Sequence, residues 1–127
     1  MNGFAERPDY IVDVRRKRNR ITVSAGSGEL LADTTAALLV DEQDHGIVFY
    51  VPRADVRSEL LARHDATSTC PFKGEAAYWR LADGEEPVAW EYPDPNPEVG
   101  LIKDHVAFYQ DRVTLTVGVA TPAVVGR

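Results

Sequence analysis

Short alternating runs of apolar and polar residues cover much of the chain, and they predict β-strands. The clearest run spans residues 112–117, where Val, Leu and Val alternate with Arg and Thr side chains. Residues 76–81 and 88–92 alternate in a similar way, and an Asp-Gly step between them is a strong hairpin signal. Because successive side chains of a strand point to opposite faces, these runs indicate strands with one buried face.

Turn signals separate the runs at intervals of about 8–12 residues, a spacing typical of sandwiches, barrels and other paired sheets. Gly-Ser-Gly at residues 26–28 and Asp-His-Gly at residues 44–46 are examples in the first half. Long helical patterns do not alternate with the strands, which argues against a parallel α/β sheet. The predicted fold class is therefore all-β and mainly antiparallel.

One short segment has helical spacing. In residues 54–61, Val56, Leu60 and Leu61 recur at i, i+4 and i+5, so they share one face of a helix of about two turns. The polar residues 62–69 that follow are predicted to form a loop.

The length of 127 residues predicts a single domain. Residues 10–24 predict an N-terminal hairpin, residues 30–40 an extended or irregular segment, and residues 121–127 a tail that frays. No stretch approaches the roughly 20 apolar residues of a membrane span, and residues 1–10 contain no apolar signal core. With a single cysteine, which excludes an internal disulfide, the expectation is a soluble cytoplasmic protein without a membrane partner.

The net charge of -6 argues against non-specific binding of nucleic acid, because a phosphate backbone attracts positive charge. A local exception is residues 15–20, which hold five cations in six positions. This run is either a phosphate-binding arm or a solvated turn between strands. The turn is the favoured interpretation, because no aromatic residues interleave with the cations as stacking platforms.

The stretch CPFKG, residues 70–74, contains the only cysteine, and a nearby cation or histidine would favour its reactive thiolate. A catalytic set of Cys70 with His105 and an acid is one hypothesis. The alternative is a buried thiol in a structural corner, which the proline and glycine of the stretch favour. Lys73 is then a candidate anion-binding charge or an ordinary surface lysine.

The aromatic residues of the second half predict either core packing or the walls of an apolar pocket. Alternation places Trp79, Trp90, Tyr92 and Phe108 on inward faces, with Tyr78 and Tyr109 of opposite parity. Residues 93–97 contain three prolines at alternate positions, so they form a stiff loop that either covers such a pocket or braces the sheet.

Metal and cofactor motifs are poorly represented, and neither a metal nor a cofactor is predicted. Structural zinc usually requires paired cysteines or histidines at short spacing, whereas the one cysteine and three histidines are widely separated. The Gly-Ser-Gly turn lacks the third glycine and following helix of a dinucleotide-binding motif.

The strings CPFKGEAAYW, AWEYPDPNPE and HVAFYQDRVTLTV, in this order and spacing, resemble a bacterial family called domain of unknown function 427. The strings LLADTTAALL and DVRSELL fit the same pattern, and the resemblance covers about residues 20–118. The family's recurrent positions correspond to Cys70, Lys73, Gly74, Tyr78, Trp90, Tyr92, His105, Phe108 and Tyr109.

The resemblance implies a β-tent, in which two antiparallel sheets meet at an angle, with one short helix. Similar domains, such as the thalidomide-binding domain of cereblon, have an aromatic-walled pocket and two zinc-binding cysteine pairs. This sequence lacks the cysteine pairs, so only the pocket is transferable. The family label suggests nucleotidyl transfer, but the paired carboxylates that would hold Mg²⁺ against a triphosphate are not apparent.

Three functions remain open. The first is a small-molecule-binding module, and its candidate ligand-binding residues are Lys73, Tyr78, Trp79, Trp90, Tyr92, His105 and Tyr109. The second is a homodimeric protein-interaction module that uses strand edges and the basic turn. The third is an enzyme in which His105 activates Cys70. We rank binding above interaction, and interaction above catalysis.

Overall fold

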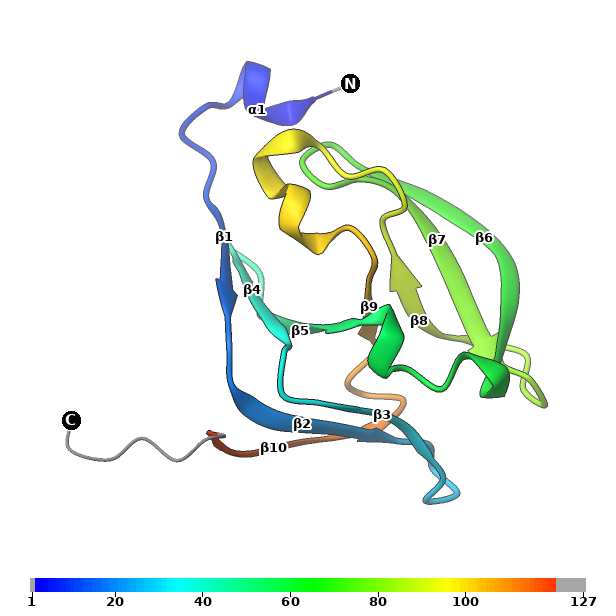
Figure 1. The fold of residues 1–127 in the computed structure, drawn as a ribbon. Coiled ribbons are helices and arrows are strands. Elements are labelled where there is room, and N and C mark those ends of the chain that lie inside the picture. Colours follow the sequence, from blue (N-terminus) through cyan, green and yellow to red (C-terminus); the bar gives the residue numbers. More distant parts are fainter. Residues whose placement is uncertain (1, 121–127) are drawn as a thin grey trace, which may run out of the picture.

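The computed structural model describes residues 2–120, which form ten strands in two sheets (Figure 1). All strand pairings are antiparallel. The larger sheet has, in spatial order, β1 (Val12–Arg16), β4 (Leu38–Glu42), β5 (Ile47–Pro52), β9 (His105–Phe108), β8 (Pro87–Glu91), β7 (Gly74–Leu81) and β6 (Leu61–Cys70). The smaller sheet has β10 (Thr114–Ala120), β2 (Asn19–Ser24) and β3 (Leu30–Thr34).

This architecture confirms the prediction of an all-β, mainly antiparallel fold with two sheets. The few helical elements are short: α1 (Gly3–Glu6) and the 3₁₀ turns η1 (Arg53–Asp55), η2 (Ser58–Leu60) and η3 (Pro97–Ile102). The predicted fraying of residues 121–127 lies outside the described residues.

The seven-stranded sheet is strongly curved. In Figure 1, β1 and β4 stand on one side, β6 and β7 stand on the other, and η3 lies between them. The three-stranded sheet packs below β5 and β9 in the same view. The larger sheet therefore has a concave face toward η3 and an opposite face toward the smaller sheet.

Each face of the larger sheet has its own hydrophobic core. The core between the sheets is built from Ile21, Val23, Leu31, Val51, Ala89, Phe108 and their neighbours. The core on the concave face is built from Leu38, Val40, Tyr50, Ala76, Tyr92, Val99, Ile102 and Ala107. The alternation of apolar side chains along β5, β8 and β9 supplies both cores, because successive residues of a strand face opposite sides.

The predicted hairpin over residues 10–24 is wrong. β1 pairs with β4 in the larger sheet, whereas β2 pairs with β3 and β10 in the smaller one. Residues 12–24 and 30–42 instead run antiparallel to each other and cross from one sheet to the other together. The backbone N–H of Lys17 donates to the carbonyl of Ala37 (2.9 Å) at this crossing. The basic run is thus a crossover between sheets, and the true reversal is the Gly-Ser-Gly turn.

The helix predicted over residues 54–61 is also wrong. Val56 forms an isolated bridge with Ala32, and the Arg57 N–H donates to the carbonyl of Leu31 (2.8 Å). This pairing holds the segment in an extended conformation between η1 and η2. The apolar residues spaced at i and i+4 do not form an α-helix here, because pairing with β3 outweighs the weak helical preference of so short a segment.

Residues 62–69 were predicted as a loop, but they belong to β6. This strand lies at the edge of the larger sheet and is mostly exposed, which explains its polar composition. Its pairing with β7 shifts register between His64 and Thr67, so a bulge also interrupts the edge.

Candidate functional site

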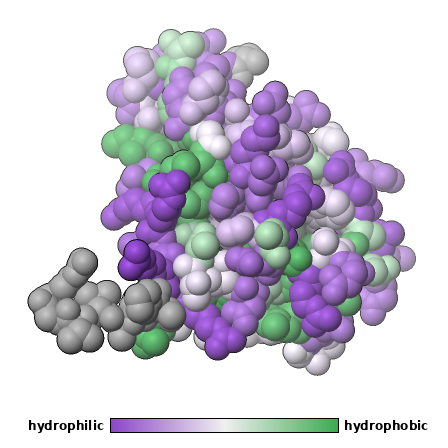
Figure 2. All heavy atoms as spheres, in the orientation of Figure 1, coloured by the Kyte–Doolittle hydropathy of each residue, from purple (hydrophilic) through white to green (hydrophobic). Residues whose placement is uncertain are grey.

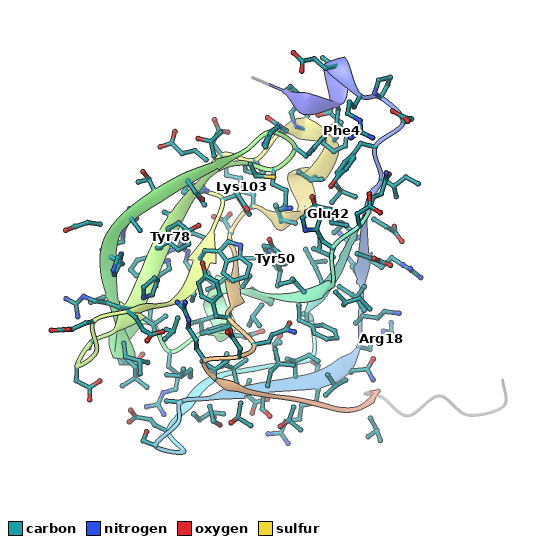
Figure 3. The ribbon with its side chains drawn as sticks, turned by 180° about the vertical axis from the view of Figure 1, so that it is seen from behind. Phe4, Arg18, Glu42, Tyr50, Tyr78 and Lys103 are labelled. Atoms are coloured by element: carbon teal, nitrogen blue, oxygen red, sulfur yellow. The ribbon has the colours of Figure 1, made fainter. Side chains whose placement is uncertain are left out.

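A cavity of about 640 Å³ opens on the concave face of the larger sheet. In Figure 3, Tyr50 lies between Tyr78 on one side and Glu42 on the other. The lining comes from β4, β5, β7, β8 and four connecting segments: Val40, Glu42, His45, Gly46, Val48, Tyr50, Lys73, Tyr78, Trp90, Tyr92 and Tyr109. Its volume lies within the range of about 300–1,000 Å³ that is usual for small-molecule sites.

Trp90 on β8 is at the centre of the aromatic wall. Its ring centroid lies 6.4 Å from that of Tyr50 in a T-shaped arrangement, and 4.7 Å from that of Tyr109 at an interplanar angle of 53°. Tyr78 is its direct partner on β7, so their side chains share one face. The Trp90 Nε1–H donates to the hydroxyl of Tyr50 (3.3 Å), which fixes the orientation of the indole.

The tyrosines bring hydroxyl groups to this wall. Burial raises the pKa of both Tyr50 and Tyr92 well above the ordinary value, so both phenols stay protonated at neutral pH. The Tyr92 side chain is only 7% exposed, and its hydroxyl has no hydrogen-bond partner among the described residues. No fully buried side-chain polar atom lacks a partner in the same residues. The Tyr92 hydroxyl therefore keeps some exposed surface, and Tyr92 is one of the residues that line the cavity.

The polar end of the cavity is an ion pair between Lys73 and Glu42. Lys73 is 8% exposed, although lysine is rarely this buried without a partner. The Glu42 carboxylate also accepts a hydrogen bond from the hydroxyl of Tyr10 (2.6 Å), and Nε2 of His45 lies 3.6 Å away. Burial by itself would raise the pKa of Glu42, but the hydrogen bonds from Lys73 and Tyr10 outweigh it and lower the pKa.

The CPFKG stretch forms the tight turn between β6 and β7, so it is a hairpin tip rather than a loop-to-strand corner. Gly74 has φ = 113°, a conformation that favours glycine, and an added Cβ would lie 3.1 Å from the carbonyl oxygen of Asp94. The Asn96 amide donates to the carbonyls of Pro71 (3.2 Å) and Phe72 (2.8 Å). The proline-rich loop thus braces the turn that positions Lys73.

Residues 2–11, which we call the N-terminal strap, hold the same turn from the other side. The Gly3 N–H donates to the carbonyl of Pro71 (2.7 Å), and an edge-to-face contact joins Phe4 to Phe72. The Tyr10 ring stacks on Phe72 with centroids 3.8 Å apart, while its hydroxyl reaches Glu42. The strap therefore links the turn that carries Lys73 to Glu42 at the end of β4.

Of the seven side chains proposed from the sequence to bind a ligand, the cavity brings five together: Lys73, Tyr78, Trp90, Tyr92 and Tyr109. Lys73 does not present a free cation, because Glu42 neutralises it. Trp79 and His105 lie elsewhere.

The grouping of Trp79 with Trp90 on one face is wrong. Trp79 pairs with Ala89, the residue before Trp90, so the two indoles lie on opposite faces of the sheet. Trp79 packs against the core between the sheets. Its Nε1–H donates to the carboxylate of Glu91 (2.9 Å), a 4% exposed residue that also pairs with Arg53. Phe108 belongs to the same core, whereas Tyr78 and Tyr109 face the cavity. Relative register between strands sets these faces, and a single strand's sequence does not record it.

The structure does not bring Cys70 and His105 together. Cys70 is on β6 and His105 on β9, with β7 and β8 between them. The Cys70 sulfur packs against the concave-face core and accepts the Lys73 N–H (3.4 Å). His105 borders a different cavity, and its Nδ1 donates to the carbonyl of Lys103 (2.7 Å).

Among the polar and aromatic side chains at this site, sequence reasoning missed Tyr10, Glu42, His45 and Tyr50. Tyr50 was detectable, because it alternates with Val48 in a clear strand. Glu42 and Tyr10 carried no local signal, since their partners lie 31 and 32 residues away.

Two further findings concern metals and membranes. Among residues 2–120, no three His, Cys, Asp or Glu side chains gather closely enough to hold a metal ion. In the same residues, no helix has the length and apolar character needed to cross a membrane.

Comparison with known proteins identifies the family. No curated protein matches the sequence. A family model described as a domain of unknown function (DUF427) matches residues 13–118. The match covers most of the chain. It includes all eleven residues that line the aromatic cavity, and the whole larger sheet except the first residue of β1. The chain therefore belongs to the DUF427 family.

Proposed function

We propose that this protein binds a small molecule in the aromatic cavity. The observation that carries the proposal is the accessible hydroxyl of Tyr92 in a cavity walled by Tyr50, Tyr78, Trp90 and Tyr109. A buried phenol that faces open space is a hydrogen-bond donor and acceptor available to a ligand. Close core packing would instead have filled this space with side chains.

The charges of the lining favour a ligand without a large net charge. Glu42 and Lys73 neutralise each other, so the cavity does not present the free cations that a triphosphate requires. This supports the view that the nucleotidyl-transfer label does not describe the site. The aromatic faces suit an apolar ring or ring edge, and the phenol hydroxyls suit its polar substituents.

The two tryptophans provide a built-in test. Trp90 lines the cavity, whereas Trp79 packs on the opposite face of the same sheet. The variant Trp79→Phe therefore leaves Trp90 as the only tryptophan, and Trp90→Phe leaves Trp79 as a matched control. Uracil, glucose and AMP represent cyclic amides, sugars and nucleotides as probes.

We expect at least one neutral probe to change the emission of Trp79→Phe in a saturable manner and to leave Trp90→Phe unchanged. The change should be lost in Tyr92→Phe, which keeps the ring and removes only the hydroxyl. Equal changes in both tryptophan variants, or tight binding of AMP alone, would contradict the proposal.

A further inference from the structure

A second cavity lies at the crossover between the two sheets, and we call it the basic cavity. It has a volume of about 440 Å³, also within the range for small-molecule sites. Its cationic side chains come from the basic run at residues 16–18, and His105 also lines it. Its apolar side includes Leu38, Pro52 and Leu101. The aromatic cavity shares none of these residues.

The fold creates this opening where two chain segments leave the larger sheet together. The Lys17 N–H still bonds to the carbonyl of Ala37, and beyond this point both segments bend toward the smaller sheet. Leu101 of η3 lies on the other side of the opening and is 45% exposed. Figure 2 shows an apolar area beside β1 within a largely hydrophilic face.

The cations of the basic cavity differ from their neighbours in the same run. Arg15 is paired with Asp13 and Arg20 with Asp33, each at 2.7 Å. Within residues 2–120, by contrast, Arg16, Lys17 and Arg18 form no ion pair. No acidic side chain lines the cavity, although the chain as a whole carries a net charge of -6. Unpaired cations gathered around a concave surface attract an anion.

An inorganic anion alone would contact the cationic side of the cavity and leave its apolar side uncovered. The apolar lining beside the cations adds a hydrophobic contribution of about 25 cal/mol for each Å² that a ligand covers. A ligand that satisfies both parts has a charged head and a short apolar body.

We propose that the basic cavity binds a small amphipathic anion, in which one phosphate or carboxylate group is attached to a short alkyl chain. The guanidinium groups of Arg16 and Arg18 hold the head group, and Leu101 covers the chain. His105 also lines the cavity, and its Nδ1–H donates to the Lys103 carbonyl (2.7 Å).

Octyl phosphate is the probe, and isothermal titration calorimetry with the full chain is the measurement. We expect inorganic phosphate and 1-octanol to bind at least tenfold more weakly, because each offers only half of the recognised chemistry. The double variant Arg16→Gln/Arg18→Gln should weaken octyl phosphate binding by about tenfold or more. Leu101→Ser should weaken it by about tenfold.

The matched control is Arg15→Gln/Arg20→Gln, which removes the same charge from the same run outside the cavity. It should change the affinity by less than about threefold, as expected for a screened charge effect. Equal losses in the two double variants, or equal affinity for inorganic phosphate, would overturn the proposal. So would the absence of octyl phosphate binding.

A last arm separates a free ligand from a membrane surface. Vesicles containing anionic phosphatidylglycerol should not sediment the protein at physiological salt if the cavity takes a single soluble molecule. Sedimentation that depends on Arg16 and Arg18, without saturable binding of octyl phosphate, would replace the proposal with a membrane-surface role.

Discussion

The Lys73 ammonium group pairs with the Glu42 carboxylate across the concave face of the larger sheet. Lys73 lies in the turn between β6 and β7, and Glu42 ends β4, with β5, β9 and β8 between these strands in the sheet. One ion pair thus spans the curve of the sheet and sets one end of the aromatic cavity. Both side chains are nearly buried, so each offsets the cost of burying the other's charge.

Lys73→Met should destabilise the fold by about 3 kcal/mol, because it leaves the Glu42 carboxylate buried without its counter-charge. The double variant Lys73→Met/Glu42→Gln should recover a large part of this loss, since no uncompensated charge remains. Urea unfolding of wild type, Lys73→Met, Glu42→Gln and the double variant measures both effects. Additive losses in the double variant would show that the two side chains do not act as a pair.

Stability should depend on pH through Glu42. The folded-state pKa of this carboxyl is lowered, so its contribution is fully present above the ordinary glutamate pKa of about 4.3. As the pH falls below that value and passes through the lower folded-state pKa, the contribution is lost. The difference in unfolding free energy between wild type and Glu42→Gln should therefore be largest near pH 7 and shrink toward pH 3. A constant difference over this range would contradict the assignment.

Tyr10 should lose its phenol proton at a higher pH than an ordinary tyrosine. Burial and its hydrogen bond to Glu42 raise its pKa to about 12, so the phenol keeps its proton in the fold when the unfolded chain would lose it. The associated stability is present below the ordinary pKa of about 10 and is lost as the pH rises toward 12. Alkaline difference absorbance of wild type against Tyr10→Phe should isolate this late step. The same variant should cost about 1 kcal/mol at neutral pH, because the Glu42 hydrogen bond is lost.

Gly74→Ala should destabilise the protein by about 2 kcal/mol. The positive φ is unfavourable for alanine, and the new Cβ would press on the backbone carbonyl of Asp94. Gly26→Ala is the matched control, because its added Cβ meets no atom within 4 Å and its φ is not positive. Its effect should stay within about 0.5 kcal/mol. Thermal unfolding of the two variants compares them directly.

Cys70 should react slowly with iodoacetamide in the folded protein. Its sulfur is half-buried, packs against the concave-face core and accepts the Lys73 N–H. We expect labelling to accelerate strongly in urea, and Cys70→Ala to preserve any ligand response of Trp90. Rapid labelling of the native protein, abolished in His105→Ala, would instead favour the cysteine enzyme.

The sequence predicted the fold class and several turns because these depend on local properties. Alternation marked residues 112–117 and 88–92 as strands, and the Asp-Gly step predicted the β7–β8 hairpin. The aromatic character of the site was visible for the same reason. Tyr78, Trp90 and Tyr92 lie in strong strand patterns close to a recognisable family motif.

Register and long-range pairing were decided only by the tertiary structure. Trp79 and Trp90 lie on opposite faces of the sheet because of the register between β7 and β8. A shift of one residue in that register would place them on the same face, and no single strand's sequence specifies it. The polar β6 forms because β7 offers it a partner, and the basic run crosses between sheets because residues 30–42 cross beside it.

The clearest contrast is Lys73. The sequence by itself determined that a cation follows the only cysteine in a tight, glycine-ended turn. The curvature of the sheet alone brought Glu42, 31 residues earlier, close enough to bury that cation. A charge can enter a low-dielectric interior only with a partner, and the partner's position is a property of the whole fold rather than of the local sequence.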